Sequence, residues 1–162
     1  MATEPTAHQD NDRARMVDVG PKEPTHRRAR AVGRLCIAPA TLTAIAAGRL
    51  PKGNPFEAAR LAGISAAKKT ADLIPLCHPL RLSFVDVTVA TLPDAAAIEV
   101  TAVAEAHERT GVEMEALTAC GIALLTIYDM LKAIDGAMTI EALRLVEKTG
   151  GKSDYRESAR ET

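Results

Sequence analysis

The amino-acid sequence predicts an α+β fold in which helices pack on one face of a mainly antiparallel sheet. Three features predict it: a long apolar helical run in the second half, two extended segments joined by a short turn, and strand and helix patterns in the order β-α-α-β-β-α-β. The chain has 162 residues, which is enough for one domain with a single hydrophobic core.

The first half of the chain is expected to contribute one strand and two helices. Residues 25–37 are expected to form the strand, because arginine and alanine alternate within them. Residues 38–48 are expected to form a short helix that begins at a proline and ends at a glycine. Asn54 is typical of a residue that caps a helix, and this second helix must end before Pro75.

The second half is expected to contribute a hairpin, a long helix and a last strand. Two alternating runs, residues 80–92 and 96–108, flank a turn-forming segment and predict an antiparallel hairpin. Residues 143–148 then complete a sheet of four strands.

The long helix, within residues 110–135, is the element around which the others are expected to pack. Between Ala116 and Tyr128 only Thr118 and Thr126 are polar, and no proline interrupts the run. A helix that is apolar all round is typical of a buried core. The run is too short to cross a bilayer, which needs about 20 apolar residues. Charged residues stand at its two ends, Glu113 and Glu115 at the start, Asp129 and Lys132 at the finish.

Composition disfavours several classes of function. The net charge is −1 and the chain has two Tyr, two Phe and no Trp, so neither nucleic acid nor a membrane is an expected partner. The N-terminus lacks the apolar segment of a secretion signal, and three widely spaced cysteines do not suggest a disulfide framework; both observations favour the cytoplasm. We expect residues 1–15 to be a disordered tail, residues 16–153 a single domain and residues 154–162 a flexible tail.

Cys77 and His78 lie between two prolines, Pro75 and Pro79, which stiffen the backbone around them. This segment could present the imidazole in a binding pocket, or it could be a packed loop whose histidine is satisfied by its neighbours. A metal site is less favoured, because the zinc-binding spacings C-x-x-C and H-x-x-x-H are absent from the sequence.

Asp129 and Lys132 are three residues apart and therefore share one face of the long helix. They could form an ordinary surface ion pair. Alternatively, apolar surroundings could lower the pKa of Lys132 enough for it to act as an acid or base. Glu115 lies about 21 Å from Asp129 along one helix at 1.5 Å per residue. The two carboxylates could therefore serve one reacting centre only if two chains build it or the substrate is long.

Glycine-flanked lysines occur at Lys52 and within residues 148–152, and such loops suit phosphate oxygens. They could equally be solvated turns, and no P-loop motif is present. Arg27, Arg28 and Arg30 could likewise form an anion-binding row or an ordinary charged strand face.

Eight segments carry a resemblance that runs from residue 16 to residue 153 without a gap. They are MVDV (16–19), the alternating strand 25–31, KG (52–53), AAKKT (66–70), DLIPLCHPL (72–80), TGVEMEAL (110–117), TIYDMLKA (126–133) and GGKS (150–153). Together and in this order they resemble the MoaC family of cyclic pyranopterin monophosphate synthases, which act in molybdenum cofactor biosynthesis.

The resemblance implies a ferredoxin-like fold, consistent with the predicted order of elements. It implies a homohexamer built as a trimer of dimers, with active sites at subunit interfaces. The implied reaction converts a cyclised dihydro-GTP nucleotide, made by an upstream radical SAM enzyme, to cyclic pyranopterin monophosphate with release of pyrophosphate. That is a lyase reaction, and no cofactor or metal is expected.

The resemblance also implies roles for individual residues. The catalytic residues would be Asp129, Lys132 and Lys52. Substrate would be held by Leu76, Cys77, His78, Met114, Glu115, Glu113, Arg27 and Lys148. Two positions depart from the family pattern: Asn54 stands where aspartate is expected, and Asp154 stands where glycine is usual.

Two other functions stay open on the sequence alone. One is a ligand-binding oligomer that has kept the pocket but lost turnover. The other is a module that binds an acidic partner or nucleic acid through Arg27, Arg28 and Arg30, which the near-neutral charge and the scarcity of aromatic residues disfavour.

Overall fold

The structure is a computed structural model that describes residues 13–158. Its elements are β1 (Thr25–Cys36), α1 (Pro39–Ala46), α2 (Pro55–Ala67), α3 (Thr70–Leu73), β2 (Leu82–Leu92), a 3₁₀ turn (Pro93–Ala95), β3 (Ala97–Glu108), α4 (Glu113–Leu131), β4 (Thr139–Thr149) and β5 (Tyr155–Arg156).

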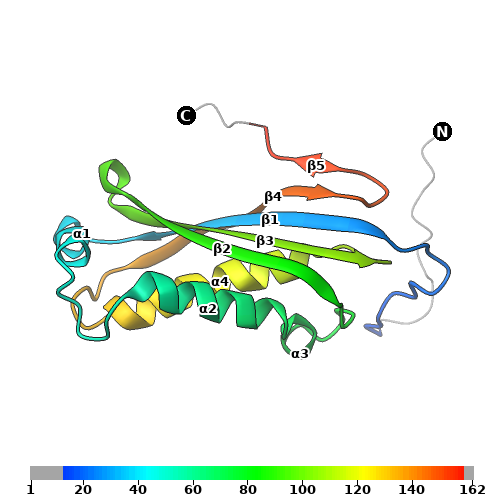
Figure 1. Cartoon of the computed structure of the whole chain (residues 1–162), viewed down its shortest axis with the longest axis horizontal. Coiled ribbons are helices and arrows are strands. Elements are labelled where there is room, and N and C mark those ends of the chain that lie inside the picture. The colour runs from blue at the N-terminus through cyan, green and yellow to red at the C-terminus, as the bar shows by residue number, and fades with distance from the viewer. Residues whose placement is uncertain (1–12, 159–162) are drawn as a thin grey trace.

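The five strands form one sheet in the order β2-β3-β1-β4-β5, and every neighbouring pair is antiparallel. The helices α2 and α4 lie side by side on one face of this sheet (Figure 1). The predicted α+β class, with helices on one face of an antiparallel sheet, is therefore confirmed, and the first four strands have the ferredoxin-like arrangement.

The strand count differs from the prediction. β4 is longer than the predicted strand 143–148, and two residues beyond residue 153, Tyr155 and Arg156, pair with it as β5. They lie in the segment expected to be a flexible tail. The expectations for residues 1–12 and 159–162 lie outside the described residues.

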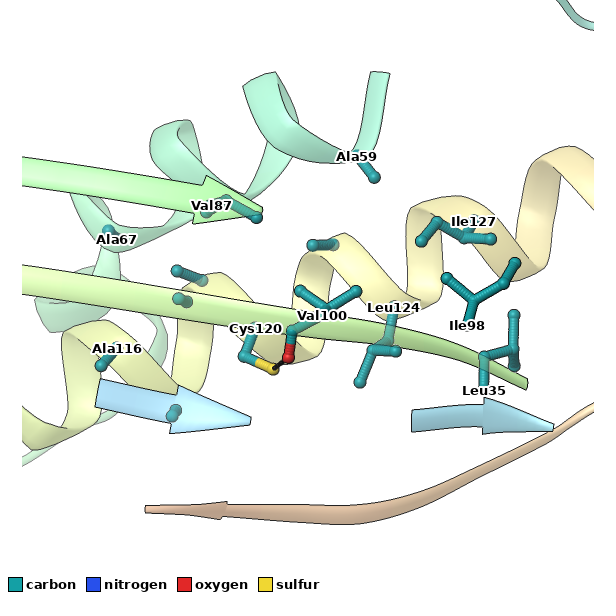
Figure 2. Packing of buried hydrophobic residues seen from close by; sticks show 14 of the residues in the cluster. Leu35, Ala59, Ala67, Val87, Ile98, Val100, Ala116, Cys120, Leu124 and Ile127 are labelled. Carbon is teal, nitrogen blue, oxygen red and sulfur yellow. Dashed lines mark hydrogen bonds between the residues drawn. The ribbon is translucent and has the colours of Figure 1, made fainter. Parts of the chain in front are cut away.

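Alanines on the inner face of the sheet let α4 approach closely. In the register of β1 and β3, Ala31 pairs with Ala102 and Ala29 with Ala104, and all four are fully buried. A Cβ added at Gly33 would come within 2.7 Å of the Leu124 side chain. Small residues on the strands therefore make room for the larger side chains of α4, which fill the core (Figure 2).

α4 is buried on one side only, so the prediction of all-round burial is wrong for a single chain. Eight of its 19 residues are buried, whereas Leu125 is 55% exposed. A single sheet and one neighbouring helix cannot cover the whole circumference of a helix. The expectation that the apolar run is too short to cross a bilayer does not hold for the whole helix, because the 19 residues of α4 could do so by length and composition alone. Its buried face, however, forms the centre of the core cluster.

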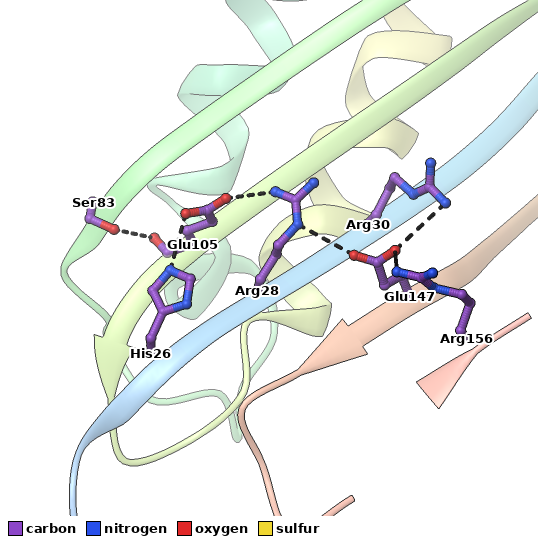
Figure 3. Close-up of polar contacts among 7 residues, drawn as sticks. All are labelled: His26, Arg28, Arg30, Ser83, Glu105, Glu147 and Arg156. Carbon is purple, nitrogen blue, oxygen red and sulfur yellow. Dashed lines mark hydrogen bonds and ion pairs between the residues drawn. The ribbon is translucent and has the colours of Figure 1, made fainter. Parts of the chain in front are cut away.

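The outer face of the sheet is polar. Arg28 on β1 bridges two carboxylates, Glu105 on β3 at 2.6 Å and Glu147 on β4 at 3.3 Å (Figure 3). Arg30 lies 3.8 Å from Glu147 as well. The arginine row is thus divided by the strand alternation, because Arg27 lies on the side of Ala29 and the helices.

Local capping explains where α2 begins, and a glycine explains how it packs. The side chain of Asn54 accepts a hydrogen bond from the N–H of Phe56 at 2.9 Å, so asparagine caps the helix here as aspartate would. Midway along α2, a Cβ added at Gly63 would lie 2.8 Å from the carbonyl oxygen of Ala119 in α4 and 3.0 Å from a methyl group of Val87. The two helices therefore touch backbone to backbone.

We expect Gly63→Ala to destabilise the protein. Alanine gains about 1 kcal/mol of helix propensity, but overpacking against a rigid backbone typically costs about 1–3 kcal/mol. Urea unfolding should show a net loss in the free energy of unfolding. Ser65→Ala, at an exposed position of the same helix, is the matched control and should be neutral or stabilising. Unchanged or increased stability of Gly63→Ala would contradict the close contact.

Candidate functional site

Two lysines and one aspartate meet at the C-terminal end of α4. Lys132 contacts Oδ1 of Asp129 at 2.7 Å, and Lys52, which precedes α2, contacts Oδ2 at 2.6 Å. Lys52 also donates to the backbone carbonyl of Asp129 at 3.3 Å. We call these three residues the lysine–aspartate cluster. Its side chains are about half exposed, and its net charge is +1 when both lysines are protonated.

Hydrogen bonds from Lys132 and Lys52 lower the pKa of Asp129 to about 2. The same contact with Asp129 raises the pKa of Lys132. The sequence-based idea that apolar surroundings lower the pKa of Lys132 is therefore wrong for a single chain, because the side chain is exposed and faces a carboxylate. At neutral pH the cluster holds a proton on Lys132 and an ionised Asp129, an arrangement that can donate a proton.

A second group of predicted residues lines a cavity of about 430 Å³ at the opposite, N-terminal end of α4. The loop before β2 contributes Leu76, Cys77 and His78, and α4 contributes Glu113, Met114 and Glu115. The proline-bounded segment thus faces a cavity, as the functional alternative for His78 required. We call this space the Glu115 cavity.

Glu115 is a buried carboxyl, with only 4% of its surface exposed. Burial raises its pKa to about 7, a hydrogen bond from its own backbone N–H opposes this, and the charge of Glu113 adds to it. Burial also raises the pKa of Cys77, and the nearby Glu115 contributes. A carboxyl that titrates near neutral pH inside a cavity is suited to exchanging protons with a bound ligand.

A smaller cavity of about 160 Å³ adjoins the Glu115 cavity and is strongly basic. The two share Lys22, Thr110, Gly111 and Glu113. Six cationic residues line the smaller one, which we call the basic cavity: Lys22, Arg27, Arg28, Arg109, Lys148 and Lys152.

Backbone contacts hold the walls of the basic cavity in place. Arg27 donates to the carbonyl oxygens of Glu108 and Arg109, and Arg109 donates to the carbonyl of Gly20 at 2.8 Å. Lys148 lies 3.4 Å from Glu113. Two of the six cations, Arg28 and Lys148, are already paired with carboxylates, and the remaining excess of positive charge in this small space suits a polyphosphate.

The lysine loop after β4 is held by Gly150 and by the unusual Asp154. Gly150 has a φ of +87°, and a Cβ there would overlap the carbonyl oxygen of His26, so only glycine fits. The Asp154 carboxylate accepts a hydrogen bond from the N–H of Gly150 at 3.0 Å. The aspartate thus closes the loop, and Lys152 still lines the basic cavity.

The structure brings the predicted site residues together as two groups. Lys52, Asp129 and Lys132 form one group, and the eight predicted substrate-binding residues line the two adjoining cavities. α4 runs unbroken between Glu115 and Asp129, so the groups stand about 21 Å apart in one chain.

Sequence reasoning missed two cations of the basic cavity, Lys22 and Arg109. Arg109 directly precedes one segment of the family resemblance, and Lys22 lies between two of them, which was the available signal. Over residues 13–158, no three or more His, Cys, Asp or Glu side chains are grouped to hold a metal ion.

Comparisons with known proteins agree in pointing to one family. Residues 16–151 match the MoaC family. A cyclic pyranopterin monophosphate synthase from Novosphingobium aromaticivorans is 61% identical over 140 residues, which cover 86% of this chain and 88% of that protein. Proteins of the same name from Parvibaculum lavamentivorans and Thermomicrobium roseum are each 54% identical. Their alignments cover 96% and 89% of this chain, and 99% and 87% of those proteins.

The raised pKa of Glu115 predicts a pH-dependent stability difference for Glu115→Gln. Between about pH 4.5 and pH 7 the folded protein keeps a proton on Glu115 that the unfolded chain has lost, so wild-type stability falls as pH rises through this window. The glutamine variant lacks this loss. Its free energy of unfolding should therefore increase by about 1–3 kcal/mol relative to that of the wild type when the pH is raised from 4.5 to 8.

Urea unfolding at both pH values measures this difference. Glu57→Gln, at an exposed position on α2, is the control and should show no such gain. A pH-independent difference between Glu115→Gln and wild type would contradict the burial of an ionisable Glu115.

Proposed function

Because this chain belongs to the MoaC family, we propose that it catalyses the synthesis of cyclic pyranopterin monophosphate in molybdenum cofactor biosynthesis. The substrate is a cyclised dihydro-GTP nucleotide, the reaction releases pyrophosphate, and the enzyme is a phosphorus–oxygen lyase. The observation that carries this proposal is the pair of adjoining cavities at the start of α4, one basic and one lined by a buried carboxyl.

The linings of the two cavities suit the two ends of a nucleoside triphosphate. The basic cavity takes the phosphates, which Arg27 and Lys148 contact as ion pairs. The Glu115 cavity takes the guanine-derived ring, whose N–H groups can donate to the carboxyl of Glu115. His78 lines the same cavity from the loop before β2, and its imidazole can contact phosphate or sugar oxygens of the bound nucleotide.

The lysine–aspartate cluster supplies the proton transfers. The reaction opens one ring, closes a pyrazine ring and forms a cyclic phosphate, so protons must move at several atoms. Lys132 donates a proton as general acid, and Asp129 holds its ammonium group in place at 2.7 Å. Lys52, bound to the other oxygen of Asp129, adds positive charge beside the reacting atoms.

A complete site requires two chains. A nucleotide in the Glu115 cavity lies about 21 Å from Asp129 of the same chain, too far for proton transfer. We propose that the lysine–aspartate cluster of one chain meets the cavities of another in a homohexamer built as a trimer of dimers. The exposed Leu125 on α4 provides apolar surface for such an assembly. Covering the half-exposed cluster with a second chain would also lower the pKa of Lys132 from its single-chain value.

The same proposal includes a source of the substrate and a cellular location. The nucleotide substrate is supplied by a radical SAM cyclase, and both enzymes work in the cytoplasm.

Incubation with the cyclised nucleotide tests the function directly. The purified protein should release pyrophosphate and form the cyclic pterin product. Saturable binding of the nucleotide without pyrophosphate release would instead support the alternative of a binding protein that has lost turnover.

Lys132→Arg tests the role of the lysine. Arginine keeps the positive charge and can contact phosphate, but it cannot lose its proton at working pH. If Lys132 transfers protons, turnover should fall at least about 100-fold. Circular dichroism and light scattering should show an unchanged fold and oligomer mass, because the exposed substitution creates no cavity. Near-normal product formation by a correctly assembled Lys132→Arg protein would show that the lysine acts only as a charge.

A further inference from the structure

A buried carboxylate beyond the end of α4 joins two segments that are distant in the sequence. Asp135 is 7% exposed, and its N–H donates to the carbonyl of Leu131, the last residue of α4, at 3.1 Å. Its Oδ2 accepts hydrogen bonds from the N–H of Ala38 at 2.8 Å and from the hydroxyl of Thr41 at 2.9 Å. Its Oδ1 accepts from the N–H of Ala137 at 3.1 Å.

These contacts make Asp135 the cap of α1. The residue before α1 is Ala38, whose side chain has no acceptor. The first N–H groups of a helix need an acceptor, and a carboxylate suits the positive end of the helix dipole. Asp135 provides that carboxylate from 97 positions further along the chain. The bond from Ala38 and those from Ala137 and Thr41 hold the pKa of Asp135 below its ordinary value despite burial.

The segment that follows α1 carries Lys52. α1 ends at Ala46, and a turn closed by the N–H of Gly53 on the carbonyl of Leu50 at 3.2 Å then presents Lys52 to Asp129. The contacts therefore form a closed circuit. The end of α4 connects Asp129 to Asp135, and hydrogen bonds connect Asp135 to the start of α1. The turn after α1 carries Lys52, which contacts Asp129.

We propose that Asp135 is a positioning residue, which seats α1 on the end of α4 and thereby determines where Lys52 meets Asp129. Its effect on turnover rests on the proposed function. Its effect on the geometry of the lysine–aspartate cluster does not, and can be measured without any substrate.

The titration of Asp129, followed by NMR in the full-length protein, tests the geometry. Two lysines hold the pKa of Asp129 at about 2 in the wild type. In Asp135→Asn the side-chain amide no longer offers a charged acceptor to Ala38 and Thr41. α1 should shift, Lys52 should withdraw, and the pKa of Asp129 should rise by about one unit. Thr41→Val removes one of the donors and should give a smaller rise, whereas Thr41→Ser keeps the hydroxyl and should titrate as wild type.

Steady-state kinetics with the cyclised nucleotide provide the second readout. Misplacement of a catalytic group by about 1 Å can cost about 100-fold, so kcat of Asp135→Asn should fall about 10–100-fold. KM should change little, because the two cavities lie at the other end of α4. Val100→Ala, a core change beside Cys120 in the middle of α4 and away from both of its ends, is the stability control and should leave kcat and the Asp129 titration unchanged.

The outcomes distinguish a positioning role of Asp135 from a role in stability alone. Wild-type kcat and Asp129 titration in a folded Asp135→Asn protein would overturn the proposal. Equal effects from Val100→Ala at the same loss of thermal midpoint would overturn it as well. If Asp135→Asn does not fold, an unchanged Asp129 titration in Thr41→Val overturns it. A shifted titration in Asp135→Asn supports the positioning role even if the wild-type protein has no turnover, a result that would count against the proposed function alone.

Discussion

The close packing of α4 on an alanine-lined sheet is the contact on which the rest of the structure depends. Alanines of β1 and β3 form the floor, Gly63 lets α2 approach the backbone of α4, and the side chains of Leu124 and Ile127 fill the space between (Figure 2). Because this packing holds α4 straight and unbroken, it also determines where the charged residues at its two ends can lie. The helix is both the centre of the core and the spacer between two functional groups.

That spacer is the reason for expecting a site made from two chains. In the proposed function, the buried Glu115 and the basic cavity bind the nucleotide at one end, and the lysine–aspartate cluster donates protons at the other. The Glu115 end can exchange a proton through its buried carboxyl, but it lacks the two lysines that the proposed reaction uses. In the single chain, the exposed contact with Asp129 raises the pKa of Lys132.

The sequence predicted the elements well where a local pattern specified them. The alternation of residue types along the chain predicted the strands, and Asn54 predicted the start of α2. The two-residue strand β5 and the one-sided burial of α4 were missed, because both depend on tertiary contacts rather than on periodicity. The contact of Lys52 with Asp129 joins residues 77 positions apart, and only the family resemblance, not spacing, suggested it. No local sequence pattern predicts the contact of Asp135 with α1, because the two are 97 residues apart in the chain.

Subunit complementation tests the two-chain site most directly. Asp129→Asn disables the C-terminal end of α4 and Glu115→Gln the N-terminal end, and each variant alone should be nearly inactive. Unfolded together and refolded as a mixture, they should recover roughly one quarter of wild-type pyrophosphate release, because half of the randomly formed pairs are mixed and each contains one intact site. A mixture no more active than the separately refolded variants would contradict a site built between chains.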